Sequence, residues 1–130
     1  MIVSQVLDII DENKNVYVRD VLTKELITYY DGENSIGVHV LIYTVEHMTI
    51  TKDGNGIVLE IMYDATDFYD LNGEAKLNCL HNYVYKICPY EHFDNMSISE
   101  IEECALEFWR QSDYTLDKNG NWYDEDFQKI

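Results

Sequence analysis

The chain has 130 residues, with 25 Asp and Glu against nine Lys and Arg, for a formal net charge of −16 at pH 7. A hydrophobic content of 46%, with 11 Tyr, four Phe and two Trp, provides enough apolar material for a core and excludes a disordered acidic tail. No run approaches the roughly 18 apolar residues of a membrane span. Residues 1–10 contain no basic residue and do not form a secretory signal. These features predict a single compact domain over residues 1–130, located in the cytoplasm.

The first half of the chain predicts one helix followed by four strands. Apolar residues that recur at i, i+3, i+4 and i+7 predict a short amphipathic helix over residues 3–12. Two β-type runs, 16–18 and 26–30, are close enough in sequence to form a hairpin. Residues 38–63 predict a second, long antiparallel hairpin, which turns at the Asp-Gly-Asn-Gly of residues 53–56.

In the second half the apolar residues recur every three or four positions. This period predicts a helix over 74–87 that ends before Pro89, and a further helix over 98–111 that a capping box opens. A small hairpin is expected around the Lys-Asn-Gly of residues 118–120. The whole order predicts an α+β fold. It combines an antiparallel four-stranded sheet (about residues 16–63), an N-terminal helix, the two later helices and the C-terminal hairpin.

The three cysteines are an odd number, and they favour reduced thiols in a cytosol over a disulfide framework: Cys79, Cys88 and Cys104. The chain is also rich in Asn, Ile and Tyr and contains a single Pro. That bias is typical of AT-rich genes in low-GC bacteria and their phages, which is an association and not a physical argument.

Candidate metal ligands are present, but their spacing is unfavourable. Four possible zinc ligands lie close together in sequence: Cys79, His81, Cys88 and His92. On a helix over 74–87, two side chains that are two positions apart point about 200° away from each other, so Cys79 and His81 cannot share an ion. Three aspartates spaced three apart form an acidic segment that fits an exposed stretch better than a cation site: Asp64, Asp67 and Asp70.

Residues 117–121, Asp-Lys-Asn-Gly-Asn, resemble the opening of a calcium-binding loop. The sixth loop position requires Gly and is Trp122, and the twelfth requires a bidentate Glu and is Gln128. An Asn-Gly hairpin explains the same residues more simply. The sequence therefore predicts no metal and no cofactor.

Catalytic and nucleic-acid-binding motifs are missing from the sequence. The chain has no Gly-flanked Ser elbow, no phosphate-binding glycine loop and no His-Glu-x-x-His pattern. Arg19 and Arg110 are its only arginines, and a domain at −16 repels a polyanion. We expect neither an enzyme nor direct binding of nucleic acid.

The acidic charge is densest near the C-terminus. Residues 91–126 contain 11 acidic and two basic residues. Glu100, Glu103 and Glu107 share the expected exposed side of the last helix, which gives about one carboxylate per 5 Å of helix axis. One DNA strand presents a phosphate about every 3.4 Å, so the two densities are comparable. This surface predicts a basic, nucleic-acid-handling protein as the partner.

Aromatic residues lie among these acids. Trp122 and Tyr123 are expected to serve as apolar anchors within a charged rim. The alternative is that Trp109 and Trp122 pin the terminal hairpin to the last helix. The residues predicted to bind the partner are Glu100, Glu103, Glu107, Asp113, Asp117, Trp122, Tyr123, Asp124, Glu125 and Asp126.

The leading hypothesis is a non-enzymatic acidic inhibitor, encoded by a phage or mobile element. It would bind the basic nucleic-acid-binding surface of a bacterial nuclease or defence complex, as anti-CRISPR and anti-restriction DNA mimics do; the analogy rests on charge and size. One alternative is an immunity protein that neutralises a basic nuclease toxin. Another is a metal- or thiol-dependent enzyme that uses the acid cluster or the cysteines. Selection for solubility alone explains the same composition.

Overall fold

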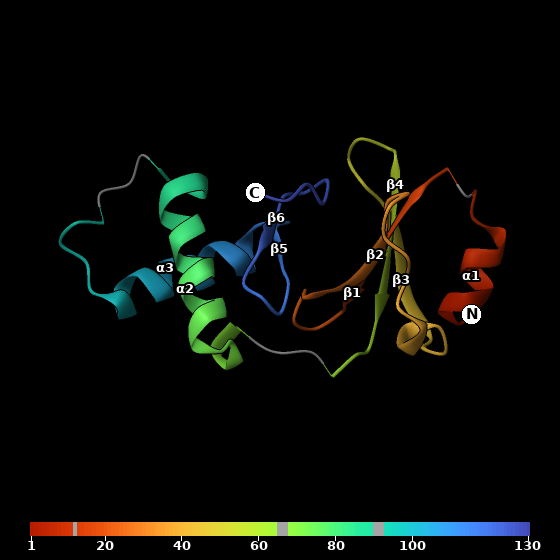
Figure 1. Ribbon diagram of the computed structural model, residues 1–130, viewed down its shortest axis with the longest axis horizontal. Coiled ribbons are helices and arrows are strands. Elements are labelled where there is room, and N and C mark those ends of the chain that lie inside the picture. Colours follow the sequence, from red (N-terminus) through yellow and green to blue (C-terminus); the bar gives the residue numbers. More distant parts are fainter. Residues whose placement is uncertain (12, 65–67, 90–92) are drawn as a thin grey trace. The chain divides into compact units, whose positions relative to one another are not determined.

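The computed structural model describes residues 1–11, 13–64, 68–89 and 93–130 (Figure 1). Its contacts divide the chain into two compact units, unit 1 (Met1–Thr66) and unit 2 (Asp67–Ile130). Each unit has an apolar core of its own and is described by itself. The single domain expected from the sequence stays a prediction. Among the described residues, no helix has both the length and the apolar character needed to cross a membrane.

Unit 1 contains a four-stranded sheet (Figure 1), in which the strand order is β2-β1-β4-β3. The strands are β1 (Asn15–Asp20), β2 (Leu26–Tyr30), β3 (Val45–Ile50) and β4 (Gly56–Ile61). The two predicted hairpins, β1–β2 and β3–β4, are both antiparallel. β1 and β4, however, run parallel. The sheet is therefore mixed.

The α+β class is confirmed, whereas the fully antiparallel sheet is wrong at its centre. Asn15 pairs with Gly56, and the parallel register continues to the pair of Asp20 and Ile61. β1 and β4 each bury four of their six residues, while β3 buries none. Strands buried on both faces belong in the middle of a sheet, so β1 and β4 join the two hairpins. Local sequence signals specify each hairpin, but they do not encode which strand of one hairpin pairs with which strand of the other.

The second hairpin also begins later than the sequence predicts. Residues Val38–Val40 form a 3₁₀-helix, η1, instead of a strand. Alternation would place Val38 and Val40 on one face, yet Val38 is 80% exposed and Val40 is fully buried. A short apolar run fits a strand or a helical turn equally well, and here the turn lets Val40 enter the core. Regular pairing starts at Val45, after an isolated bridge between Thr44 and Ile2.

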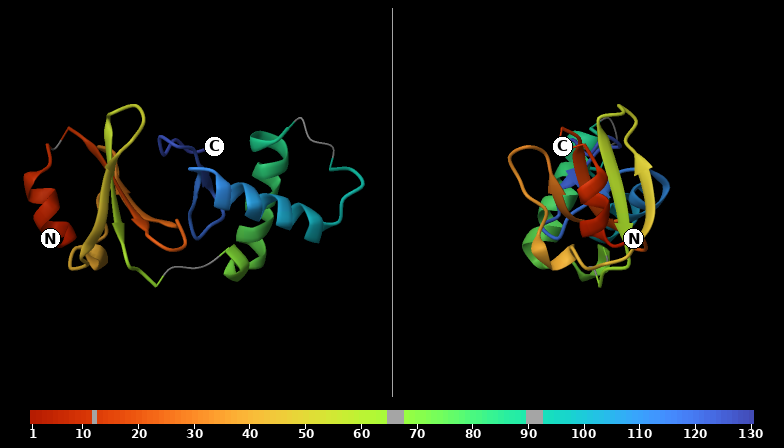
Figure 2. Two further views of the ribbon diagram at one scale, coloured as in Figure 1. Left: turned by 180° about the vertical axis from the view of Figure 1, so that it is seen from behind. Right: turned by 90° about the vertical axis from the view of Figure 1, so that its right-hand side faces the viewer.

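The first helix, α1 (Val3–Ile9), is shorter than the predicted 3–12, and Glu12 lies outside the described residues. Figure 2 shows α1 against one face of the sheet. Its buried residues, Val3 and Val6, join side chains from β1, β4 and η1. This core consists of Val3, Val6, Val16, Val18, Val40, Leu59 and Ile61.

Unit 2 is built on two helices. Its described residues begin with the 3₁₀-helix η2 (Phe68–Asp70). Next comes α2 (Gly73–Asn82), which continues as a π-helical turn, η3 (Tyr83–Ile87), so the predicted extent of 74–87 is confirmed. α3 (Ile98–Gln111) has the predicted bounds.

The predicted capping box opens α3. The Ser97 hydroxyl accepts from the Glu100 backbone N–H at 3.2 Å, and the Glu100 carboxylate accepts from the Ser97 N–H at 3.2 Å. These two bonds satisfy orphan donors at the helix start. Ser97 is thus the N-cap residue.

The C-terminal hairpin pairs β5 (Thr115–Leu116) with β6 (Trp122–Tyr123), which confirms the predicted turn. The final residue returns to this hairpin, because the Ile130 N–H donates to the Trp122 carbonyl at 2.9 Å. Trp122 lies in the core of unit 2. That core consists of Phe68, Leu71, Ala75, Cys79, Leu80, Tyr83, Ala105, Leu106, Trp109, Leu116 and Trp122.

Candidate protein-binding surface

Three carboxylates lie in a row on the outer side of α3. Glu100, Glu103 and Glu107 are exposed, as the sequence predicts, while Ala105 and Trp109 on the other side of the helix are buried. We call this set the α3 carboxylate row. A 1.5 Å rise per residue places its members about 4.5 and 6 Å apart along the axis. Their exposure is established; their role in binding stays a prediction.

Weak local bonds hold the two ends of the row. Glu100 accepts from the Ser97 hydroxyl at 3.0 Å in addition to its capping bond. Glu107 accepts from the Gln111 side chain at 3.1 Å, one helical turn later. Both bonds use one oxygen of an exposed carboxylate, so the charges remain accessible to solvent and to a partner.

Asp117 has a structural role in the β5–β6 loop. One of its oxygens accepts from the N–H groups of Asn119 and Asn121, at 2.9 and 3.0 Å. The other accepts from the Asn121 amide at 3.0 Å and from the Tyr123 hydroxyl at 2.9 Å. Four donors within the loop therefore use the whole carboxylate. The calcium-like spacing of these residues reflects this Asx turn.

Asp124 shapes the next turn in a similar way. One of its oxygens accepts from the N–H groups of Asp126 and Gln128, both at 2.9 Å. The turn contains Phe127 at φ 60°, in the left-handed region. Of the remaining predicted acids, Asp113 and Glu125 are exposed and Asp126 is partly buried.

The structure corrects the predicted aromatic anchors. Trp122 is fully buried, and its indole N–H donates to the Cys79 carbonyl of α2 at 2.9 Å. Its ring lies 5.7 Å from that of Phe108 in α3. Tyr123 is only 7% exposed. Neither side chain can reach a partner while the hairpin is folded, and Trp122 pins that hairpin to both helices.

The hairpin loop also docks closely on α2, which the sequence did not reveal. The Asn78 side chain donates to the Asn119 carbonyl and to the Asn121 side chain, both at 3.0 Å. Gly120 has φ +76°, and a Cβ there would collide with the Ala75 carbonyl. The Asn-Gly pair thus serves both the turn and this close approach.

The candidate thiol and metal residues are dispersed. Cys79 is fully buried, and burial raises the pKa of its thiol to about 12. His81 is exposed, with its ring 4.7 Å from Tyr85. His92 and Asp67 lie outside the described residues. Across the part of the chain that the structure describes, no three His, Cys, Asp or Glu side chains come together in a way that could hold a metal ion.

Unit 2 has an apolar groove that the sequence did not predict. It lies between α2–η3 and the start of α3, has a volume of about 350 Å³, and is lined in part by Leu77, Val84, Tyr85, Ile98 and Ile101. Leu77 belongs to the apolar residues whose period predicts the helix over 74–87, yet this residue is 65% exposed. The apolar residues of α2 cover a wider arc of the helix than one buried stripe needs, and this width was the signal in the sequence for an exposed apolar surface.

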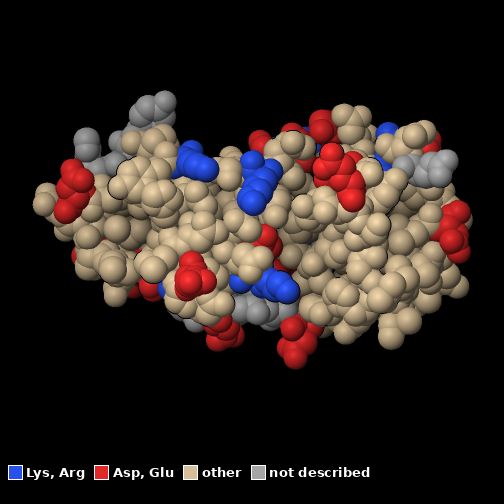
Figure 3. Space-filling view, viewed as in Figure 1, with Lys and Arg blue, Asp and Glu red and all other residues tan. Residues whose placement is uncertain are grey.

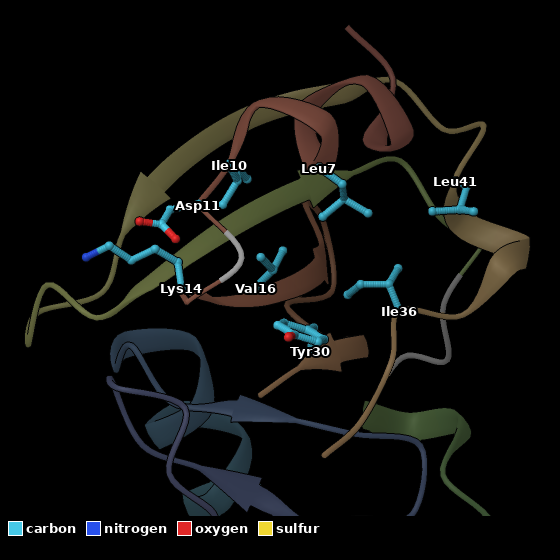
Figure 4. Close-up of a pocket in the computed structure, with 8 residues that line it drawn as sticks. All are labelled: Leu7, Ile10, Asp11, Lys14, Val16, Tyr30, Ile36 and Leu41. Atoms are coloured by element: carbon cyan, nitrogen blue, oxygen red, sulfur yellow. The ribbon is translucent and has the colours of Figure 1, made fainter. Parts of the chain in front are cut away.

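A second pocket, of about 320 Å³, lies in unit 1 (Figure 4). Its lining residues are Leu7, Ile10, Asp11, Lys14, Val16, Tyr30, Ile36 and Leu41. The Lys14 ammonium donates to the Gly54 carbonyl at 3.1 Å, and the Asp11 carboxylate accepts from the Asn13 N–H at 2.9 Å. Both charged groups are therefore engaged in local bonds at the rim of an apolar hollow.

Acidic residues are numerous in both units. Unit 1 contains 11 acidic and four basic residues, and unit 2 contains 14 and five. Figure 3 shows carboxylates spread over the visible face between larger uncharged areas.

No family model, curated protein or solved structure matches the chain.

Proposed function

We propose that this chain is a non-enzymatic acidic inhibitor of a nucleic-acid-handling protein. It binds the basic surface on which a bacterial nuclease or defence complex holds DNA or RNA, and it excludes the nucleic acid from that surface. It acts in the cytoplasm of a bacterial host and is encoded by a phage or mobile element. Anti-CRISPR and anti-restriction proteins of the DNA-mimic type act in this way as a functional class.

The α3 carboxylate row is the observation that carries the proposal. Three exposed carboxylates on one rigid helix repeat at a spacing comparable to that of backbone phosphates. The capping box fixes the first turn of that helix, so the row is presented in a defined geometry. Arg and Lys side chains that bind phosphates can bind carboxylates in a similar manner.

The overall charge supports the same partner. A net charge of −16 exceeds the magnitude of about 2–8 that suffices to keep a small domain soluble. Such a surface repels itself and lowers stability, and a basic partner relieves this repulsion. It also attracts a basic protein over distance and repels nucleic acid directly.

Competition with nucleic acid tests the proposal. Purified bacterial nucleases and CRISPR or restriction complexes are assayed for cleavage of a labelled DNA duplex with and without the full chain. We expect inhibition of at least one of them, and mutual exclusion of the chain and the duplex in a binding assay. A stable ternary complex, with DNA in its channel and the chain bound, would contradict occlusion.

Charge variants separate the α3 carboxylate row from the net charge. The triple variant Glu100→Gln, Glu103→Gln and Glu107→Gln keeps helix propensity and leaves a capping-box residue at the third helical position. The matched control neutralises three exposed carboxylates of unit 1, by Asp8→Asn, Glu33→Gln and Glu46→Gln. We expect the first variant to inhibit at least tenfold less well and the control to inhibit as the wild type does. Equal loss in both would remove the α3 carboxylate row from the proposal.

A further inference from the structure

The exposed apolar residues of unit 2 are concentrated at one place. Among its described residues, three large hydrophobic side chains are strongly exposed: Leu77 at 65%, Tyr85 at 66% and Ile98 at 64%. All three line the groove between α2–η3 and α3. Exposed apolar residues that gather around a hollow are typical of an interaction site, unlike those that are scattered singly.

The groove has the form that receives a helix. Leu77, Val84 and Tyr85 project from α2–η3 at helical spacing, and Ile98 and Ile101 face them from the start of α3. The floor is formed in part by Leu80, which is only 7% exposed. Ridges of helical side chains with an apolar hollow between them accept the i, i+3, i+4 and i+7 residues of an amphipathic helix.

Both walls of the groove are held by local bonds. The Asn72 side chain caps α2 by accepting from the Ala75 N–H at 2.9 Å, and the Ser97 capping box fixes the first turn of α3. Between the two helices, the Lys76 ammonium lies 4.0 Å from the Glu102 carboxylate. The groove is therefore pre-formed, which lowers the ordering cost of docking.

Charge selects the kind of helix. Asp94 lines the groove, whereas Glu102, which follows the lining residue Ile101 in sequence, is paired with Lys76. The exposed Lys86 lies on the same helical segment as Tyr85, but unit 2 as a whole has 14 acidic against five basic residues. A helix with Lys or Arg beside its apolar face complements this surroundings, whereas a second copy of a chain at −16 is repelled.

We infer that this groove docks an amphipathic basic helix of the protein that the chain inhibits. The basic character of the occupant rests on the proposed function. The groove supplies the apolar anchors that the buried Trp122 and Tyr123 cannot, and the α3 carboxylate row supplies electrostatic attraction. The two surfaces of unit 2 thus have different roles. The groove mainly determines the dissociation rate of the complex, and the α3 carboxylate row mainly determines the association rate.

A synthetic helix of about 15 residues tests the docking. The probe has Leu at i, i+3, i+4 and i+7 and Lys at the other positions, and it carries a fluorescent label. A peptide of the same composition in scrambled order is the charge-matched control. Its affinity for the full chain, measured by fluorescence anisotropy at about 150 mM salt, reports charge attraction alone. We expect the amphipathic probe to bind at least tenfold more tightly than the scrambled one.

Variants test whether the difference in affinity between the two peptides arises in the groove. Leu77→Gln with Ile98→Gln removes two exposed anchors and should bring the affinities of the two peptides to within about twofold. The control, Ile9→Gln with Leu22→Gln, changes residues of unit 1 that are 72% and 75% exposed and should preserve the full difference. Both pairs of residues are exposed, and circular dichroism verifies that each variant is folded.

Four outcomes would overturn the inference: equal affinity for both peptides, wild-type peptide affinity in Leu77→Gln with Ile98→Gln, a concentration-dependent dimer that this variant abolishes, or unchanged inhibition in this variant. The dimer would make the groove an interface between copies. The proposed function fails separately, when the chain inhibits no nucleic-acid enzyme although the groove binds the probe. If inhibition persists unchanged in the groove variant, the function stands and the groove does not take part.

Discussion

Trp122 shows at the scale of a single residue how burial decides between two roles. Its side chain is fully buried, and its N–H bonds to the Cys79 carbonyl. Trp122→Phe leaves that buried carbonyl without its indole donor and opens a small cavity, so we expect the free energy of unfolding to fall by about 2–4 kcal/mol. Urea denaturation followed by circular dichroism measures this loss. Unchanged stability with weaker partner binding would restore Trp122 as an anchor.

Gly120 lies where the terminal hairpin approaches α2 closely. Gly120→Ala introduces a Cβ that meets the Ala75 carbonyl, at a left-handed φ of +76° that disfavours Ala. We expect unit 2 to lose at least about 2 kcal/mol of stability. Tryptophan fluorescence during urea denaturation reports the effect, because both tryptophans lie in unit 2.

Gly73→Ala is the matched control for this substitution. Gly73 is the first residue of α2, and a Cβ there meets no atom within 4 Å. In this variant the free energy of unfolding of unit 2 should change by less than about 0.5 kcal/mol. If Gly120→Ala were equally mild, the close docking of the loop on α2 would be wrong.

Cys79 gives a prediction that depends on pH. Burial raises the pKa of its thiol from 9.0 to about 12. Between these values the unfolded chain releases a proton that the folded chain retains, so the free energy of unfolding falls as pH rises from about 9 towards 12. Below that range the thiol is protonated in both states and adds no pH dependence.

Alkylation tests the burial of the Cys79 thiol directly. At pH 8 the folded chain should react with iodoacetamide at the partly exposed Cys88 well before Cys79, because burial shields Cys79 from the reagent and disfavours its reactive thiolate. Mass spectrometry of the digested protein locates the label. Labelling of Cys79 at the rate of Cys88 would contradict its burial and would revive a thiol-enzyme role for it.

At the scale of elements, the β5–β6 hairpin depends on one carboxylate. Asp117 accepts four hydrogen bonds within the loop, from Asn119, Asn121 and Tyr123. Asp117→Ala leaves these donors without their acceptor, and we expect the stability of unit 2 to fall by about 1–3 kcal/mol. Thermal unfolding measures this loss of stability. The control is Asp113→Ala, which removes an exposed acid next to the same hairpin. A similar midpoint in the two variants would count against this structural role.

Elements with a local code were predictable from the sequence. The Ser97–Glu100 capping box and the heptad-like apolar stripe specify α3, and the Asp-Gly-Asn-Gly turn specifies β3–β4. The parallel pairing of β1 with β4 joins segments far apart in the chain, and no short-range signal encodes it. Residues 38–40 have an apolar pattern that a strand and a 3₁₀ turn share.

The candidate site was predictable to a similar extent. Exposure of the α3 carboxylate row follows from the helical period, since Glu100, Glu103 and Glu107 lie opposite the apolar stripe. The burial of Trp122 depends on where the hairpin folds back, which the period of one element does not show. The exposed groove at Leu77 and Ile98 likewise arises only when α2 and α3 come together.

For the whole molecule, a net charge of −16 acts over distances longer than any single contact. Raising ionic strength from about 50 to 500 mM shortens the Debye length from roughly 14 to about 4 Å, and attraction between exposed charges weakens accordingly. We expect this long-range attraction to act mainly on the association rate and the contacts in the groove to act mainly on the dissociation rate. Salt dependence therefore separates the two contributions.

The most direct measurement is the rate of association with the inhibited enzyme as a function of salt, by stopped-flow fluorescence. For the wild-type chain we expect the rate to fall at least tenfold between about 50 and 500 mM salt. The Glu100, Glu103 and Glu107 triple variant should have a slower rate at low salt and a shallower dependence, and the Asp8, Glu33 and Glu46 control should retain most of the wild-type dependence. An association rate that is unchanged by salt, or a triple variant that behaves as the wild type, would contradict binding through the α3 carboxylate row.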